Sequence, residues 1–212
     1  MGSVPAVPLL RAFEGEMPPD DVLAALRDGE AAGVALYRGL NVRSPRQLRE
    51  LGDSLRAAAR EGGHPTPIVA IDQEGGQLMG IGAPATQFAG PMAMAAAGDP
   101  GLAERVGAAI GAELLARGVN IDWAPDLATT PSSPAVGTRA FGDDAALAGQ
   151  LGGVRARPPG SGVAASIKHF PGSGETLADP HHGLPVVGVD AATLEARELV
   201  PFRAAIEQAP RS

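Results

Sequence analysis

The stretch GVALYRGLNVRSPRQLRELGDSLRAAAREGGHPTPIVAID, residues 33–72, contains the signals that decide the fold. It begins with a short apolar run, GVALY, and ends with another, IVAID, and each has the length of a buried strand. Between them, Ser44 offers a capping hydroxyl and Pro45 suits the first helical position, so a helix is predicted over RQLRELGDSLRAAARE. A strand, a helix and a second strand in this order predict a parallel βαβ unit.

The same alternation continues on both sides of this unit. Three further apolar runs have the character of strands: VPLLRAF (7–13), VNIDW (119–123) and VAASIKHF (163–170). Helix signals separate them, because Asp99 and Pro100 open GLAERVGAAIGAELLARG and Gly118 ends it. Asp190 opens a last helix that carries LEARELVPFRAAIEQ. The sequence therefore predicts an α/β fold with a parallel sheet.

Two α/β architectures fit this pattern, the open doubly wound sheet and the (β/α)8 barrel of TIM type. No G-x-G-x-x-G follows the first strand and no Walker sequence occurs, which argues against nucleotide binding. Polar residues instead follow several different strands, namely Asp72, Asp122, Asp126, Lys168 and His169. Catalytic groups that come from many strand ends are typical of a barrel. We expect a barrel-type fold with about five to six βα units, fewer than the eight of a closed barrel.

The length and the end of the chain predict one incomplete domain. The 212 residues suit a single domain over 1–212, and 44% apolar with 19% charged residues argues against disorder. The helical pattern breaks at RARPPGSG, residues 155–162, and no strand follows the last helix. We expect a barrel domain that is truncated at its C-terminus.

Charge and cysteine content narrow the function classes. The net charge of −7 gives no basic surface for nucleic acid. The lack of cysteine excludes disulfides, thiolate zinc sites and cysteine nucleophiles, and it fits a reducing compartment. The start of the chain shows no signal peptide, and the uncharged stretch 75–98 is rich in Gly and Pro, which predicts loop rather than a membrane span. We expect a cytoplasmic protein that binds neither nucleic acid nor membrane.

The strongest chemical signal is KHFPGSGETLADPHHGLP, residues 168–185, which holds three of the four histidines. Asp179 and His181 are two residues apart, and a carboxylate beside an imidazole fixes its tautomer and raises its pKa. Such a pair can move a proton near neutral pH. Lys168 and His169 offer donors for sugar hydroxyls or a carboxylate. The alternative interpretation is that Asp179 caps a turn and the histidines are solvated.

Two further clusters carry candidate binding residues. In IDQEGGQL, residues 71–78, Asp72 ends a strand before two glycines, which suits a carboxylate that binds a pair of hydroxyls. The same letters also describe a common tight turn. In PSSPAVGTRAFG, residues 131–142, Arg139 presents a fork of donors suited to a polar ligand, or forms a surface salt bridge.

The histidine cluster also raises the question of a metal. His169, His181 and His182 with Asp179 have the donor types of an N/O site. Adjacent histidines point in different directions on an extended loop, and no H-E-x-x-H spacing occurs. We expect no metal ion and no other cofactor.

Together, IDQEGG (71–76), PSSPAVGTRAFG (131–142) and KHFPG followed by D-x-H and LP (168–185) resemble glycoside hydrolase family 3 in its β-N-acetylhexosaminidase branch. The resemblance is collinear from about residue 13 to residue 206. The pair of KHFPG and D-x-H separates this branch from the β-glucosidases of the family, whose proton donor is a carboxylic acid.

The resemblance implies a (β/α)8 barrel that removes terminal β-linked N-acetylglucosamine with retention of configuration. It implies a small carbohydrate or muropeptide as substrate and a role in peptidoglycan recycling. His181 and Asp179 fall on the acid/base positions. The sugar-binding positions of the family are occupied by four residues: Asp72, Arg139, Lys168 and His169.

The sequence also departs from the family pattern. The nucleophile of the family is an aspartate in a later strand-end loop, so no residue of 1–212 is assigned to it. Gly80 replaces an arginine that clamps the substrate, Ser173 replaces a second histidine, and Pro180 replaces the serine of D-S-H. Two other functions therefore stay open: a non-catalytic sugar-binding remnant without the nucleophile, and another family 3 activity such as a β-glucosidase or a phosphorolytic enzyme.

Overall fold

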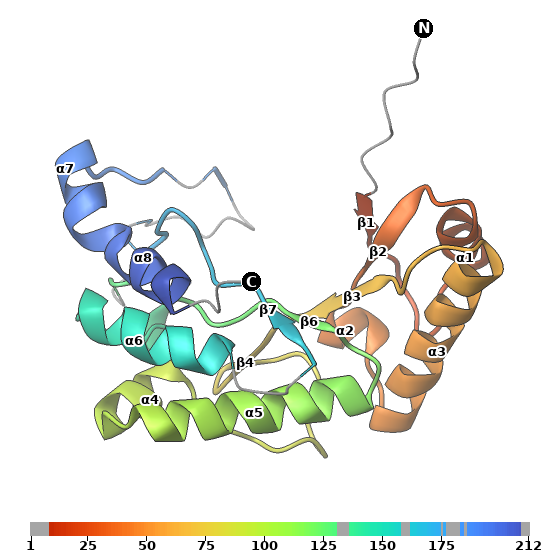
Figure 1. Cartoon of the computed structure of the whole chain (residues 1–212), viewed down its shortest axis with the longest axis horizontal. Helices are drawn as coiled ribbons and strands as arrows, with labels where there is room; N and C mark the ends of the chain where they lie inside the picture. Colours follow the sequence, from red (N-terminus) through yellow and green to blue (C-terminus); the bar gives the residue numbers. More distant parts are fainter. Residues whose placement is uncertain are drawn as a thin grey trace, which may run out of the picture.

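The computed structural model describes residues 9–130, 136–157, 162–174, 176, 183–184 and 186–208. Its main sheet has five strands, all parallel, in the order β1-β2-β3-β6-β7 (Figure 1). Their bounds are β1 Leu9–Arg11, β2 Ala31–Ala35, β3 Ile68–Ile71, β6 Ile121–Asp122 and β7 Ala164–Ala165. The strands cross the sheet in chain order, as in a barrel, whereas a doubly wound sheet reverses its order at a switch point. The predicted α/β fold of barrel type is confirmed as a partial barrel.

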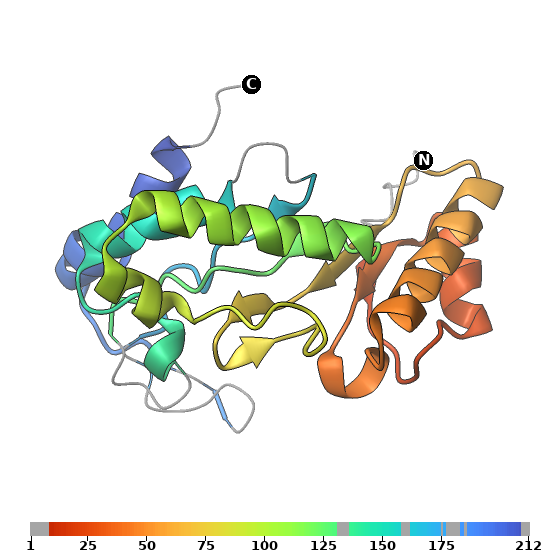
Figure 2. The same cartoon turned by 90° about the horizontal axis from the view of Figure 1, so that it is seen from below.

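Helices connect the strands and pack against one another. Their bounds are α1 Asp20–Arg27, α2 Arg38–Asn41, α3 Pro45–Glu61, α4 Pro91–Ala97, α5 Pro100–Ala116, α6 Ala145–Ala156, α7 Ala191–Thr193 and α8 Val200–Glu207. Helix α1 packs on α3, α5 on α6, and α6 on α8. Seen from below, α5 runs from α3 at one end of the domain to α4 and α6 at the other (Figure 2). None of the described helices is both long and apolar enough to cross a membrane.

The predicted helix starts are confirmed. The Ser44 hydroxyl accepts a hydrogen bond from the Gln47 amide at 3.1 Å, and α3 begins at Pro45. Asp99 accepts from the Gly101 amide at 2.8 Å, at the start of α5. These caps satisfy amide groups that have no partner inside the helix.

Two segments differ from the prediction. The stretch 75–98, expected to be loop, contains most of an antiparallel hairpin, β4 Gln73–Gly75 with β5 Leu78–Met79, and also helix α4. The alanine-rich sequence of α4 favours a helix because alanine loses the least entropy there. Helix α6 includes Arg155 and Ala156, the first two residues of the segment 155–162 in which the break is predicted, and 158–161 lie outside the described residues.

The helix predicted after Asp190 is interrupted. It forms α7, a π-helical turn over Leu194–Glu198, and α8. Pro201 has no amide hydrogen to donate to the preceding turn, so a regular α-helix cannot continue through it.

Two apolar clusters hold the elements together. The larger lies between the sheet and the helices α1, α3 and α5, and its fully buried members include Leu26, Leu48, Leu51, Ile71 and Leu114. The smaller joins α5, α6 and α8 around Leu127, Phe141, Leu151 and Phe202. The helices cover the outer side of the sheet, and both apolar clusters lie against them. The carboxyl ends of the strands are therefore occupied by polar side chains.

Candidate active site

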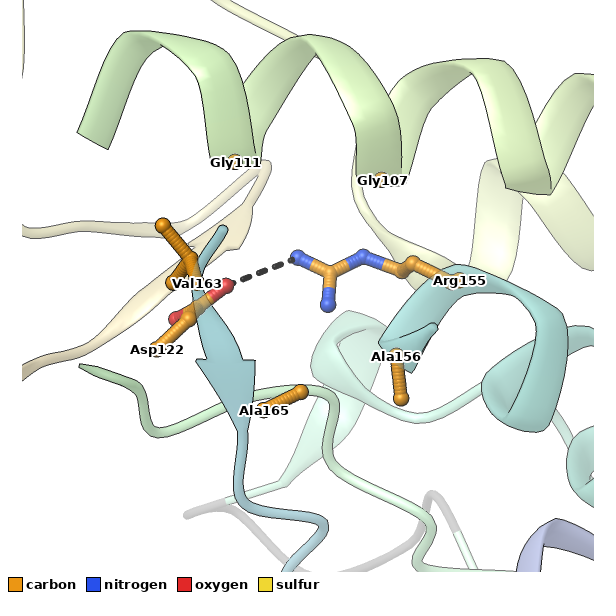
Figure 3. Close-up of a pocket in the computed structure, with 7 residues that line it drawn as sticks. All are labelled: Gly107, Gly111, Asp122, Arg155, Ala156, Val163 and Ala165. Atoms are coloured by element: carbon orange, nitrogen blue, oxygen red, sulfur yellow. Dashed lines mark ion pairs between the residues drawn. The ribbon is translucent and has the colours of Figure 1, made fainter. Parts of the chain in front are cut away.

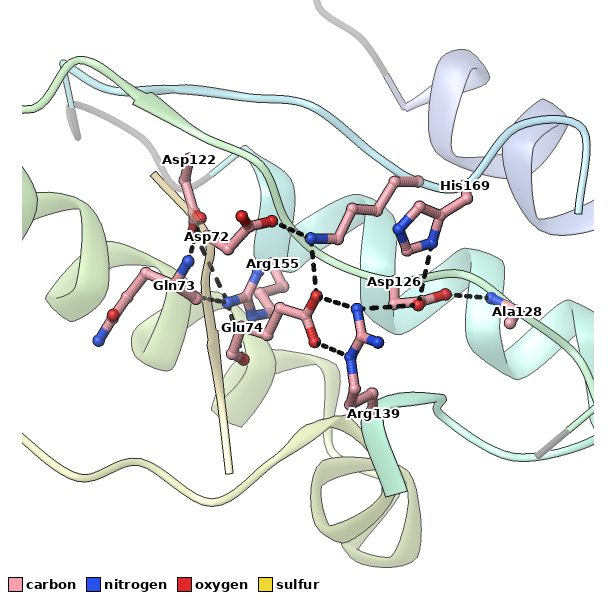
Figure 4. A network of polar contacts seen from close by, with 10 residues as sticks. Asp72, Gln73, Glu74, Asp122, Asp126, Ala128, Arg139, Arg155 and His169 are labelled. Atoms are coloured by element: carbon pink, nitrogen blue, oxygen red, sulfur yellow. Dashed lines mark hydrogen bonds and ion pairs between the residues drawn. The ribbon is translucent and has the colours of Figure 1, made fainter. Parts of the chain in front are cut away.

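Polar side chains from distant parts of the chain meet at the carboxyl ends of the central strands (Figure 4). Asp72 follows β3 directly, Asp126 follows β6, and Lys168 follows β7. Parallel strands end at the same edge of a sheet, so these residues come together although up to 96 positions separate them. Glu74 on β4 and Arg139 on a 3₁₀ turn, Gly137–Arg139, complete the group.

Lys168 forms ion pairs with two carboxylates. Its Nζ contacts Asp72 Oδ1 and lies 2.7 Å from Glu74 Oε1. The Lys168 side chain is 13% exposed, that of Asp72 23%, and that of Glu74 is fully buried. The ammonium group is therefore held at the edge of the site, where both it and the Asp72 carboxylate are partly exposed.

Arg139 binds the same buried carboxylate from the other side. Its Nε and Nη2 each donate a hydrogen bond of 2.8 Å to an oxygen of Glu74, which is the bidentate geometry of a strong pair. These hydrogen bonds raise the pKa of Arg139 above its ordinary value. Glu74 thus fixes two cations, Arg139 and Lys168, next to each other.

His169 lies beside a second buried carboxylate. Its Nδ1 is 3.2 Å from Asp126 Oδ2, and its ring is about half exposed. Asp126 Oδ1 accepts from the Ala128 amide at 2.9 Å, and Arg139 Nη2 lies 3.7 Å from Oδ2. Within the described part of the chain, Asp126 Oδ2 makes no hydrogen bond of good geometry. This oxygen is fully buried and lies between the His169 imidazole and the Arg139 guanidinium.

A second polar layer lies beneath the first. The buried Arg155 donates through Nη2 to the carbonyl oxygens of Gln73 at 2.8 Å and Glu74 at 3.0 Å. Asp122 Oδ1 accepts from the Gln73 amide at 2.9 Å, and its Oδ2 lies 3.8 Å from Arg155. Both hydrogen bonds of Arg155 hold the backbone of β4 in place. Glu74 of this strand in turn binds Arg139 and Lys168 in the first layer.

Burial dominates the electrostatics of this lower layer. It raises the pKa of Asp122 from 3.8 to about 6, against the opposing charge of Arg155, and it lowers the pKa of Arg155. A cavity of about 20 Å³ lies beside the pair, between Gly107 and Gly111 of α5 and Val163 (Figure 3). That is room for one water molecule.

The structure brings together all four predicted sugar-binding residues: Asp72, Arg139, Lys168 and His169. It does not test the predicted acid/base pair, because Asp179 and His181 lie outside the described residues. His182, weighed as a metal ligand, lies outside them too. Within the described ranges, no group of three His, Cys, Asp or Glu residues is placed to hold a metal ion.

The sequence interpretation missed Glu74 and Arg155 as site residues. Glu74 was part of the quoted D-Q-E-G-G motif, but its role depends on Arg139 and Lys168, which are 65 and 94 positions away. The available signal was its spacing from Asp72, since alternate residues of an extended segment lie on one side.

A partial parallel barrel with cations and carboxylates at its strand ends is the arrangement of a βα-barrel enzyme domain. The model of the glycosyl hydrolase family 3 N-terminal domain matches residues 9–212. The chain therefore belongs to glycoside hydrolase family 3, as the resemblance predicted.

Relatives and solved structures show which members of the family this chain is similar to. The chain is 34% identical to a β-hexosaminidase A of Pseudoalteromonas piscicida, over 94% of the chain and 34% of that protein. It is 34% identical to a β-hexosaminidase of Alkalilimnicola ehrlichii, over 92% of the chain and 57% of that protein. A family 3 β-N-acetylglucosaminidase of Paenibacillus has a similar structure, with a TM-score of 0.88, 36% identity, and coverage of 95% of this chain and 39% of that one.

A third comparison concerns a ligand. NagZ of Neisseria gonorrhoeae, solved in complex with N-trifluoroacetyl-D-glucosamine, has a TM-score of 0.84 and 25% identity, and the match covers 95% of this chain and 60% of that one. The chain thus spans between about a third and somewhat more than half of the curated relatives given above.

Proposed function

We propose that the chain supplies the sugar-binding and proton-transferring part of a hydrolase that removes terminal β-linked N-acetylglucosamine. The observation that carries the proposal is the network in which Glu74 and Asp126 hold Lys168, Arg139 and His169 at the strand ends. Family membership, and relatives named as β-hexosaminidases, support the choice of sugar.

Each group in the network has a distinct task in binding. Lys168 and Arg139 donate hydrogen bonds to sugar hydroxyls, and Asp72 accepts them, while the buried Asp126 holds His169 and Arg139. Glu74 stays buried and keeps the two cations in place, so they do not reorganise when the sugar arrives. Because these groups are held before binding, little of the binding free energy is lost in ordering them.

Bond cleavage is assigned to the dyad that the sequence predicts. His181 donates a proton to the departing glycosidic oxygen while a carboxylate attacks the anomeric carbon and forms a glycosyl-enzyme bond. His181 then takes a proton from water, which attacks the same carbon and releases the sugar with retained configuration. Asp179 fixes the imidazole tautomer and stabilises its charged form. The attacking carboxylate is not assigned within 1–212. We place the reaction in the cytoplasm, on muropeptides of peptidoglycan recycling.

The 212-residue chain allows a direct test of the binding part. Titration with N-acetylglucosamine, followed by NMR amide shifts, is expected to show binding that Lys168→Ala weakens at least tenfold, because a charged hydrogen bond is lost. Arg46→Ala is the control, since Arg46 forms an exposed pair with Glu50 on α3. Absence of binding by the unchanged chain refutes the proposal.

The same chain also tests the division of roles. With a chromogenic N-acetyl-β-glucosaminide we expect binding without turnover, because no residue of 1–212 is assigned as the nucleophile. Turnover would show that a nucleophile lies within these residues. Tight sugar binding by a longer polypeptide of this protein, again without turnover, would favour the non-catalytic remnant.

The dyad can be tested without any turnover. The four histidines give few imidazole NMR signals, and His181→Gln identifies the one that belongs to His181. We expect Asp179→Asn to lower the pKa of His181, because an adjacent carboxylate stabilises the imidazolium. An unchanged pKa would refute the pairing, and an equal change at His64, which lies outside this motif, would show a general charge effect.

A further inference from the structure

A second cavity lies next to the sugar-binding network. It has a volume of about 140 Å³ and lies between the segment after β2 and the hairpin β4–β5. Tyr37, Arg38, Asp72 and Gln77 are among its lining residues. Asp72 belongs both to this cavity and to the ion pair with Lys168. A sugar that binds Asp72 therefore borders the cavity.

Arg38 is the basic residue that lines this cavity, and no carboxylate of a described residue pairs with it. Lys168, Arg139 and Arg155 all lie close to carboxylates. The Arg38 side chain, in contrast, makes no ion pair or hydrogen bond to any residue that the structure describes, and the residue is exposed. Its five donor hydrogens are available to a ligand in a planar fork.

The guanidinium of Arg38 lies close to the loop after the hairpin. A Cβ added at Gly82 would lie 2.6 Å from Arg38 Cζ, so the guanidinium packs directly against this loop. A side chain at position 82 would therefore displace this guanidinium.

The wall of the same cavity lacks a side chain at position 80. A Cβ added at Gly80 would lie 2.5 Å from Ile71 Cγ1 and 2.7 Å from the Asp72 carbonyl oxygen. This backbone therefore accepts no side chain at 80 without shifting. Position 80 is where the resemblance places a substrate-binding arginine, and Arg38 lines the same cavity from the start of α2, just after β2.

We propose that Arg38 is a sugar-binding residue, whose guanidinium donates hydrogen bonds to hydroxyl groups of the sugar in the cavity beside Asp72. From the segment after β2, Arg38 supplies the hydrogen-bond donor that is missing at position 80. Tyr37, which is 44% exposed beside it, offers an aromatic surface to the apolar face of the same sugar. The inference rests on the proposed function and names an additional contact of that site.

The test measures the affinity of the 212-residue chain for N-acetylglucosamine by calorimetry or NMR titration at constant ionic strength. We expect Arg38→Ala to raise the Kd about tenfold, as the loss of a charged hydrogen bond does. Arg38→Lys keeps the charge but loses the planar fork of donors, so its Kd is expected to lie between the values of the wild type and of Arg38→Ala. Arg60→Ala is the matched control, since Arg60 is exposed at the C-terminal end of α3, away from the strand carboxyl ends.

A second variant separates position from charge. Gly82→Ala keeps Arg38 but displaces its guanidinium, and we expect it to weaken binding in the same direction. Thermal unfolding of each variant shows that the fold is retained, which an exposed Arg38 predicts. Wild-type affinity in Arg38→Ala, alongside weakened binding in Lys168→Ala, would overturn this inference and leave the proposed function intact. An equal loss in Arg60→Ala would overturn it too, and no binding by the unchanged chain would overturn both.

Discussion

The buried carboxylate of Asp122 predicts a pH dependence of stability whose sign is unusual for an aspartate. Its pKa is raised to about 6 by burial, although Arg155 and Lys168 oppose the shift and Asp72 adds to it. A group whose pKa is higher in the folded state than in the unfolded state binds protons more tightly when folded. Its contribution to stability is therefore largest at low pH and is lost as the pH rises from about 4 to about 6.

The magnitude follows from the difference in pKa. The ordinary aspartate pKa of 3.8 and the pKa of about 6 in the folded state differ by about 2, and each pKa unit corresponds to about 1.36 kcal/mol. Ionised Asp122 therefore lowers the free energy of unfolding by about 3 kcal/mol at neutral pH. Asp122→Asn resembles the protonated acid, so it removes this loss. This is a large part of the 5–15 kcal/mol by which a typical domain is stable.

Urea unfolding of the wild-type chain and of Asp122→Asn between pH 4 and pH 7.5 measures the effect. The stability of the variant relative to the wild type is expected to rise with pH by about 3 kcal/mol, because all other carboxylates are common to both chains. Asp190→Asn is the control, since a backbone hydrogen bond from Thr193 lowers the pKa of Asp190 and predicts a slope of opposite sign. Parallel curves for the wild type and Asp122→Asn, or a relative stability that falls with pH, would refute the reasoning.

Two further substitutions test other parts of the structure. Glu74→Gln leaves Lys168 and Arg139 without their shared charge, so we expect a loss of about 3–5 kcal/mol in the free energy of unfolding together with weaker N-acetylglucosamine binding; unchanged stability in urea unfolding would contradict this role. Ser44→Ala removes the cap that the Gln47 amide uses and should cost about 1 kcal/mol by the same measurement, whereas a difference near zero would show that the cap is dispensable.

The strands and the capped helices could be predicted because their signals are local. The Ser44 and Asp99 caps lie within three residues of their partners, and alternating strands and helices fix a parallel sheet. The site was predicted only in part. Asp72, Lys168 and Arg139 were identified as strand-end and loop residues, but Arg155 was assigned to a helix break.

The reason for the missed residues is physical. The partners of Arg155 are carbonyl groups 81 and 82 positions away, so no local pattern marks it as a buried donor. A charged residue in a glycine-rich helix has the same local sequence whether it faces water or the interior. The hydrogen bonds between Arg155 and the two carbonyl groups form because the fold brings α6 next to β4. Neither element's own sequence indicates this contact.

Glu74 connects the two polar layers, and this suggests why the domain tolerates so many buried charges. Its carbonyl oxygen accepts from Arg155 below, and its carboxylate binds Lys168 and Arg139 above. Burying ions costs free energy even when they are paired, so the layers are weak contributors to stability. What they provide is rigidity: the donors of the proposed sugar-binding site are anchored to β4, and β4 is anchored to α6. A sugar-binding site gains from this because its hydroxyl partners are in place before the ligand arrives.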